Sequence, residues 1–237
     1  MMNYNLLKTN MEVYVKIFNR LNNKRTAFTM AEVLITLSIV GIIAVLTLPN
    51  VMASYTKRTT VAQLQRTYNS LRTAFTEYLS NERANLLSNT DMNSKMGVYH
   101  FLQKYMNSAK ICAWEEDENT LEVDASGKCV AESYLDLSGN PTEIAKEDID
   151  DFVCAVLEFG TSICIRPASL TEKVGIYIDV TGSKIPNRLG HDLFYFEANN
   201  DGKLEVWNDN AEDCSREGGV GLSCFYKIVK DGWSIDY

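Results

Sequence analysis

One acidic side chain stands at the start of the most apolar stretch of this chain. Glu32 directly precedes the segment Val33 to Leu48, which contains no charged residue, and the basic pair Lys24 and Arg25 comes shortly before it. A carboxylate beside an apolar helix is costly unless a cation meets it. Glu32 is therefore expected to be functional and to pair with a positive charge.

Residues suited to catalysis are scarce. The chain has two histidines, His100 and His191, and it contains no HExxH motif, no GxSxG motif and no phosphate-binding glycine loop. Its glycine cluster, Gly218 to Gly221, lies between two cysteines rather than between a strand and a helix. The sequence therefore predicts a protein that is not an enzyme and has no catalytic residue.

Three oxygen-bearing side chains, Asp179, Asn187 and Asp192, fall within one loop and are the candidates for a calcium site. Their spacing matches no EF-hand loop. Asp and Asn are also ordinary turn formers, because their side chains bond to nearby backbone groups. We therefore expect a structural turn here, with no resident metal and no cofactor.

The six cysteines all lie beyond the apolar segment, and no two of them form a CxxC motif. An even number of cysteines in an exported domain suits a disulfide framework in an oxidising compartment. Several pairings are possible. The one that joins neighbours along the chain pairs Cys112 with Cys129, Cys154 with Cys164, and Cys214 with Cys224.

Charge is distributed unevenly along the 237 residues. Five basic residues and one acidic residue precede Phe28, whereas the remainder carries 18 basic and 30 acidic residues, a net charge of −12. A basic start before an apolar helix predicts a cytoplasmic N-terminus and an exported body. The acidic body is not suited to bind the phosphate groups of a nucleic acid, so direct nucleic-acid binding is not expected.

The first part of the chain divides by composition. Residues 1–27 form a basic leader, and the 21 residues 28–48 would span roughly 30 Å as a helix, enough to cross a membrane. Residues 49–87 follow as an amphipathic helix, and Pro49 is expected to kink this helix rather than end it. Its apolar stripe recurs every three or four residues: Leu64, Tyr68, Leu71, Phe75 and Tyr78 or Leu79.

The remaining residues suit one domain. Residues 88–150 show no clear pattern and form a variable region, in which residues 100–106 fit either a short helix or a strand. Residues 151–237 contain segments typical of strands, with turns at Gly160 and Gly202. We expect an α+β fold in which an antiparallel sheet of about four strands buries the helix stripe. The C-terminal residues 225–237 are expected to add a strand or to dock on the sheet.

Two ordinary export signals fit the apolar segment as well. It could be a secretory signal peptide cleaved before Ser54, or an uncleaved membrane anchor. In either case the chain would be an exported or membrane-anchored binding protein. The length of the apolar run, 16 residues, and the helical pattern that continues through Ser54 argue against the cleaved signal.

The run from Lys24 to Glu32, followed by an apolar helix and Pro49, resembles the N-terminal cleavage and methylation motif of type IV pilins and type II secretion pseudopilins. With Phe28 as the first mature residue, Glu32 and Pro49 match the acid and the proline of that family. Ala27 departs from the glycine usual before the cleavage point. The motif covers only about a tenth of the chain.

This resemblance implies a pilin-like fold and a role as a structural subunit of a pilus or a secretion pseudopilus. A prepilin peptidase would cut between Ala27 and Phe28, the new amine of Phe28 would be methylated, and Glu32 would pair with the amine of a neighbouring subunit. The implied partners are that peptidase, other pilin or pseudopilin subunits and inner-membrane assembly machinery. The chain would cross the inner membrane once, with its C-terminal domain in the periplasm, before entering a filament.

The stretch from Ile178 to Asp192 carries a second resemblance. Its sequence, followed by Phe194-Tyr-Phe, is similar to a stretch of many pseudopilin-like proteins, some of which hold calcium in a C-terminal loop.

Overall fold

The computed structural model of the chain describes residues 28–115, 121–123, 129–145, 151–207, 211–214 and 219–237. The chain divides into two units between Ala53 and Ser54, so described residues 28–53 belong to the first unit and those from Ser54 onward to the second. Ala27 and the rest of the predicted leader lie outside the described residues.

One helix, α2 (Met30–Glu82), replaces the two predicted helical segments. It continues through Pro49, as expected of a proline that the flanking helix tolerates. The predicted end at residue 87 was wrong, because Arg83 adopts a left-handed φ of 51° and closes the helix five residues earlier. No glycine or proline at this point marks the end in the sequence.

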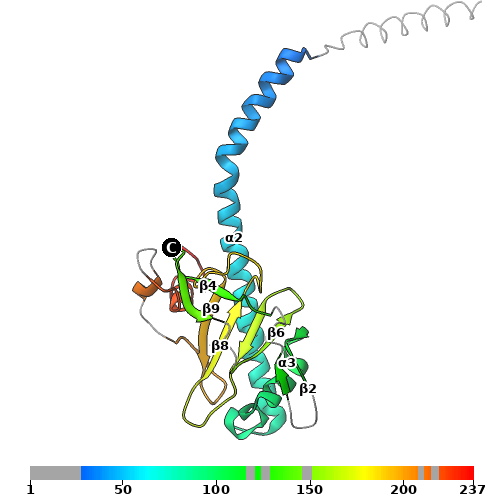
Figure 1. Cartoon of the computed structure of the whole chain (residues 1–237), viewed down its shortest axis with the longest axis vertical. Helices are drawn as coiled ribbons and strands as arrows, with labels where there is room; N and C mark the ends of the chain where they lie inside the picture. Colours follow the sequence, from blue (N-terminus) through cyan, green and yellow to red (C-terminus); the bar gives the residue numbers. More distant parts are fainter. Residues whose placement is uncertain (1–27, 116–120, 124–128, 146–150, 208–210, 215–218) are drawn as a thin grey trace, which may run out of the picture. The chain divides into compact units, whose positions relative to one another are not determined.

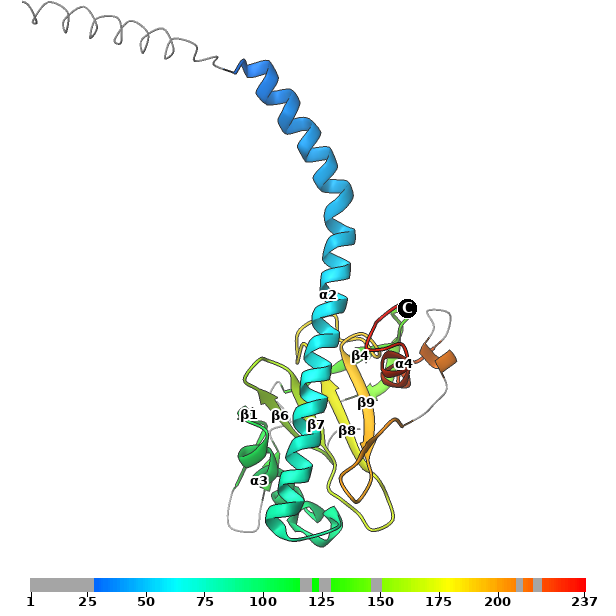
Figure 2. The same ribbon diagram turned by 180° about the vertical axis from the view of Figure 1, so that it is seen from behind.

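The second unit is built on a six-stranded antiparallel sheet, which confirms the predicted α+β class. The strands follow the order β1-β6-β7-β8-β9-β10 across the sheet. Their bounds are β1 (Ser108–Ile111), β6 (Val153–Leu157), β7 (Ser162–Ile165), β8 (Val174–Asp179), β9 (Leu193–Ala198) and β10 (Leu204–Glu205). Figure 2 shows residues 54–82 of α2 lying along one face of this sheet.

The two predicted turns are confirmed, because β6 and β7 flank Gly160, and β9 and β10 flank Gly202. In β8, Val174, Ile176 and Ile178 alternate along the strand and are buried in the core. The β6–β7 hairpin turns at Gly160 with φ 86°, and the β9–β10 hairpin turns at Gly202 with φ 80°. Glycine meets these positive φ values without the steric cost that a Cβ would bring.

The core lies between α2 and the sheet. Leu64, Leu71 and Phe75 of the predicted stripe are completely buried. The ring of Phe75 stacks on that of Phe101 with centroids 5.1 Å apart. Phe101 belongs to α3 (Lys95–Tyr105), so the segment that fitted either a helix or a strand is a helix.

The opposite face of the sheet is covered by disulfides and a small hairpin. Two disulfides cluster there with Phe152, which directly precedes β6. Tyr134 is fully buried beside Leu193 and Leu189. Tyr134 belongs to β4, which pairs with β5 and is visible over this face in Figure 1.

The prediction of about four strands was too low. β1 lies inside the predicted variable region and pairs with β6, and β10 adds a short edge. The segment after Ser223 begins as a helix, α4, whose Phe225 and Ile228 are buried in the core, rather than as a strand. The remaining elements are η1 (Leu87–Asn89), η2 (Asp91–Asn93), β2 (Ala113–Glu115), β3 (Leu121–Val123), β4 (Ser133–Leu135), β5 (Pro141–Ala145), η4 (Ala211–Cys214) and α4 (Cys224–Lys230).

Truncating the stripe should destabilise the second unit. We expect Leu64→Ala to lower the free energy of unfolding by about 2 to 5 kcal/mol, because it opens a cavity between α2 and the sheet. Thr76→Ala on the exposed side of α2 should change it by less than about 0.5 kcal/mol. Chemical denaturation of the full chain in detergent measures both, and equal effects would contradict the packing described.

Candidate functional site

The start of α2 is held by a reciprocal pair of bonds between Thr29 and Glu32. The backbone N–H of Thr29 donates to Glu32 Oε2 at 2.8 Å, and the Thr29 hydroxyl donates to the same oxygen at 2.9 Å. In return the backbone N–H of Glu32 donates to Thr29 Oγ1 at 3.2 Å. This is a capping box, which satisfies two backbone donors that a helix start otherwise leaves unpaired.

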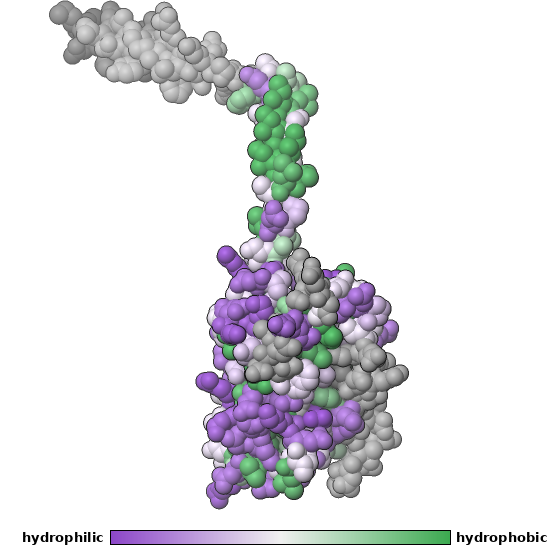
Figure 3. All heavy atoms as spheres, turned by 90° about the vertical axis from the view of Figure 1, so that its left-hand side faces the viewer, coloured by the Kyte–Doolittle hydropathy of each residue, from purple (hydrophilic) through white to green (hydrophobic). Residues whose placement is uncertain are grey.

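The apolar segment behind this cap is exposed on every side. Phe28 is 83% exposed, and the large apolar side chains from Val33 to Leu48 are all more than two-fifths exposed. Within the described residues, α2 is the one helix long and apolar enough to cross a membrane by length and composition. Figure 3 shows this stretch as a continuous green surface on the face in view. Such a surface requires a membrane or partner helices around it.

Polar groups inside the apolar segment are satisfied within the helix. The hydroxyls of Thr36, Ser38 and Thr47 each donate to a backbone carbonyl three or four residues earlier, at 2.8 to 3.0 Å. Internal satisfaction of this kind is what a helix needs where water is absent. The segment is thus compatible with hydrocarbon surroundings.

The other predicted residues of this region remain predictions. Ala27 of the expected cleavage point lies outside the described part of the chain. Pro49 lies inside α2, and its expected kink stays a prediction. Methylation of Phe28 and the charge pairing of Glu32 involve other molecules and likewise stay predictions.

The loop between β8 and β9 brings two of the three calcium candidates together. Asp179 and Asp192 are both almost fully buried, and the hydroxyl of Thr181 lies 3.3 Å from Asp179 Oδ1 and 3.0 Å from Asp192 Oδ2. The backbone N–H groups of Asn187 and Arg188 donate to Asp192 at 2.7 and 2.6 Å. The two carboxylates therefore tie the loop to itself.

Tyr134 completes this buried cluster from the β4 strand. Its hydroxyl donates to Asp179 Oδ2 at 2.7 Å and accepts from the backbone N–H of Ala131 at 3.1 Å. Burial, followed by the charge of Asp192, raises the pKa of Asp179 to about 8. Burial also raises the pKa of Asp192, and burial beside Asp179 raises that of Tyr134.

These contacts support the structural interpretation of the loop. Every carboxylate oxygen of Asp179 and Asp192 faces a donor of this chain. Asn187 contributes its backbone N–H, and its side-chain oxygen is buried with no hydrogen-bond partner among the described residues. In that part of the chain no group of three or more His, Cys, Asp or Glu side chains is placed to hold a metal ion.

The buried acid predicts a pH-dependent stability. An acid whose pKa is raised by folding keeps its proton in the folded state, while the unfolded chain releases it from about pH 4 upward. The contribution of Asp179 is thus fully present below about pH 4 and is lost as the pH rises to about 8. It changes by at most about 1.4 kcal/mol per pH unit.

Asp179→Asn should remove this contribution. Relative to the unaltered chain, the free energy of unfolding of the variant should rise between pH 4 and pH 8, and Asp151→Asn, whose side chain is 88% exposed, should not change the profile. Denaturation of the full chain in detergent across this pH range makes the comparison. Parallel profiles for all three proteins would contradict the assignment.

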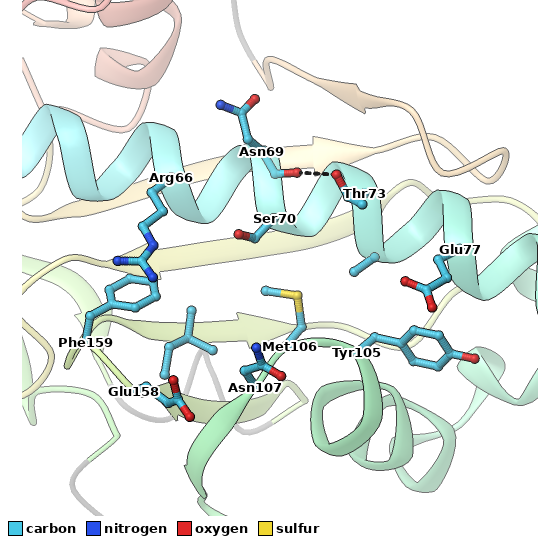
Figure 4. Close-up of a pocket in the computed structure, with 12 residues that line it drawn as sticks. Arg66, Asn69, Ser70, Thr73, Glu77, Tyr105, Met106, Asn107, Glu158 and Phe159 are labelled. Carbon is cyan, nitrogen blue, oxygen red and sulfur yellow. Dashed lines mark hydrogen bonds between the residues drawn. The ribbon is translucent and has the colours of Figure 1, made fainter.

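A groove runs beside α2 in the second unit, and no motif or periodicity in the sequence predicts it. It has a cavity volume of about 410 Å³ and lies between α2, the end of α3 and the β6–β7 turn. Figure 4 shows the guanidinium of Arg66 lying over the ring of Phe159, 4.4 Å from its centroid. Glu77 and Tyr105 lie at the other end of the groove.

Three disulfides join the predicted neighbours, namely Cys112–Cys129, Cys154–Cys164 and Cys214–Cys224. The second links β6 to β7 at directly opposed residues. Because Cys112 also donates its backbone N–H to the carbonyl of Cys154 at 2.9 Å, the first two disulfides pack against each other. The first disulfide thereby ties Cys129, which precedes β4, to Cys112, which directly follows β1.

Neither a protein-family model, nor a curated protein, nor a solved structure matches this chain significantly.

Proposed function

We propose that the chain is a structural subunit of a filament of the type IV pilin or type II secretion pseudopilin kind. The observation that carries the proposal is the contrast within one helix. The part of α2 after Glu32 exposes apolar side chains all round, whereas residues 61–78 bury one stripe against an antiparallel sheet. A subunit that leaves a membrane to join a bundle of like helices needs both surfaces.

Processing is proposed at the start of the same helix. A prepilin peptidase would cut between Ala27 and Phe28 on the cytoplasmic side, and the amine of Phe28 would then be methylated. Thr29 caps α2, so the cleavage point lies directly before the first turn. Phe28 is exposed, which suits a residue that an enzyme must reach.

Glu32 is proposed as the residue that sets the position of a new subunit. Its carboxylate would meet the positively charged amine of Phe28 from a neighbour, and methylation keeps that amine cationic. In apolar surroundings a subunit docked out of position would leave both charges unpaired, which is strongly unfavourable. The partners are then other pilin or pseudopilin subunits and the inner-membrane machinery that assembles them. The C-terminal domain would occupy the periplasm before and during assembly.

The mature N-terminus is the first test. We expect mass spectrometry of the protein from its native membrane to find a chain that begins at Phe28 and carries one added methyl group. A chain that begins at Ser54 would instead indicate a secreted protein, and an uncut leader an anchored binding protein. Either of these two results would refute the proposal.

The second test separates the charge of Glu32 from its role in the cap. Glu32→Gln should retain the capping box, because glutamine serves at this position, but should reduce filament yield strongly, because the charge is lost. Glu32→Leu should reduce yield as well. Thr29→Ala weakens the helix start by about 1 kcal/mol and keeps the carboxylate, so it should still assemble.

Filament yield would be measured by shearing and immunoblotting, with membrane insertion and cleavage followed in the same cells. Membrane insertion and cleavage are expected to stay largely intact in all three variants. Normal filament yield from the Glu32→Leu protein would refute the proposed role of Glu32 in assembly. Loss of assembly in Thr29→Ala alone would assign the effect to the helix start.

A further inference from the structure

Charge is segregated along the part of α2 that packs on the sheet. Residues 54–76 contain four basic residues and no acidic residue, whereas residues 77–237 contain 14 basic and 29 acidic residues, a net of −15. The boundary falls within one helix. A separation of this kind is not needed to bury the stripe, because the charged residues lie on its exposed sides.

Three of these cations have no acidic partner in the described part of the chain. Arg58, Arg66 and Arg72 are exposed, and none forms an ion pair with a described acid. Arg66 is held over the Phe159 ring, which limits its freedom before any partner arrives. The fourth, Lys57, donates to the carbonyl of Tyr237 at 3.0 Å. We call Arg58, Arg66 and Arg72 the basic stretch.

The C-terminal end of α2 and the segment that follows it are acidic. Glu77, Glu82 and Asp91 are exposed and are likewise without an ion pair among the described residues. Burial, together with the charges of Glu82 and Asp91, raises the pKa of Tyr78, so both acids lie near that hydroxyl. We call Glu77, Glu82 and Asp91 the acidic end.

Each of the two surfaces also carries one opposing charge. Glu158 lines the groove beside Arg66, and Arg83 follows Glu82. Counting these, the basic stretch keeps a net charge of +2 and the acidic end a net charge of −2. The two surfaces therefore remain complementary in sign.

We propose that the basic stretch of one copy docks against the acidic end of a second copy that runs in the same direction and is displaced along the helix. The occupant is a second copy because the chain itself supplies both charges, on surfaces that form no ion pair with another described residue. The inference rests on the proposed function in one respect, since copies anchored by the same apolar segment stand side by side in one direction.

The spacing of the charges supports a single displacement. Arg66 and Glu77 are 11 residues apart, and Arg72 and Glu82 are 10 apart. At 1.5 Å per residue, a slide of about 15 to 17 Å brings each pair to the same level. At 3.6 residues per turn the two pairs point roughly 120 to 140° apart around the helix, so each pair faces a different neighbouring copy. Figure 4 shows Arg66 and Glu77 at opposite ends of one groove, where long side chains of a neighbour can reach them. Because the contact joins two different surfaces, it repeats along the assembly rather than closing a dimer.

Charge reversal tests the contact in the full chain in membranes. Arg66→Glu with Arg72→Glu makes both surfaces acidic, and Glu77→Arg with Glu82→Arg makes both basic. Each double variant alone should repel its own copies. Expressed together, the two variants restore opposite charges wherever unlike copies meet, so they should associate again in alternation.

A photo-reactive amino acid at Asn69, exposed within the basic stretch, reports the association. We expect cross-links to residues 77–91 of a second copy, recognised as mixed pairs when isotope-labelled and unlabelled chains are combined. Their yield should fall about fivefold or more in each double variant and recover on co-expression. It should also fall as salt is raised. The matched control, Lys184→Glu with Lys230→Glu, reverses two exposed bases outside α2 and should leave the yield unchanged.

The inference is overturned if the double variants cross-link as well as the unaltered chain, if co-expression fails to restore the yield, or if the cross-links fall outside residues 77–91. Correct disulfides and resistance to protease verify that each variant is folded. The proposed function fails separately, on a mature N-terminus other than Phe28. A methylated Phe28 together with unchanged cross-links would refute only the docking described here.

Discussion

The helix α2 must satisfy two environments along one continuous backbone. Between Val33 and Leu48 nearly every side chain is apolar, and none of them is buried within the chain. From Val61 to Tyr78 the apolar positions narrow to a stripe that is almost fully buried. Burial of this stripe is the main favourable term available to the second unit, because it is the surface that both the sheet and α3 cover.

The rest of the second unit follows from covering both faces of the sheet. One face is closed by α2, and the aromatic contacts of Tyr68 with Phe196, Phe225 and Trp233 join α2, β9 and the C-terminal segment. On the other face, no helix of comparable length lies among the described residues. Disulfides and the buried Tyr134 cover this face instead. A disulfide stabilises the fold by constraining the unfolded chain, so it can substitute for apolar burial where the buried apolar area is small.

Sequence reasoning worked where local chemistry and tertiary structure agree. β6 to β9 were predictable because alternation is strong and glycine marks the turns. β1 was not, because its four residues, Ser-Ala-Lys-Ile, carry no alternation and depend on pairing with β6. The Tyr134 contact to Asp179 joins residues 45 apart, so no local pattern could indicate it. The capping box of Thr29 and Glu32 has a local signature, a threonine followed three residues later by a glutamate before an apolar run, so it is predictable from the sequence.

That capping box bears on how Glu32 can act in an assembly. The bonds from Thr29 all go to Oε2, and among the described residues Oε1 accepts none. A carboxylate has about four lone-pair sites, so it can keep the cap and still accept a charged amine from outside. An incoming subunit therefore does not need to break the first turn of α2 in order to pair with it. The cap also fixes the side chain before the partner arrives, which lowers the entropy lost on pairing. The capping role of Glu32 and its proposed intermolecular role would therefore reinforce each other, and a substitution that preserves the cap is the one that isolates the charge.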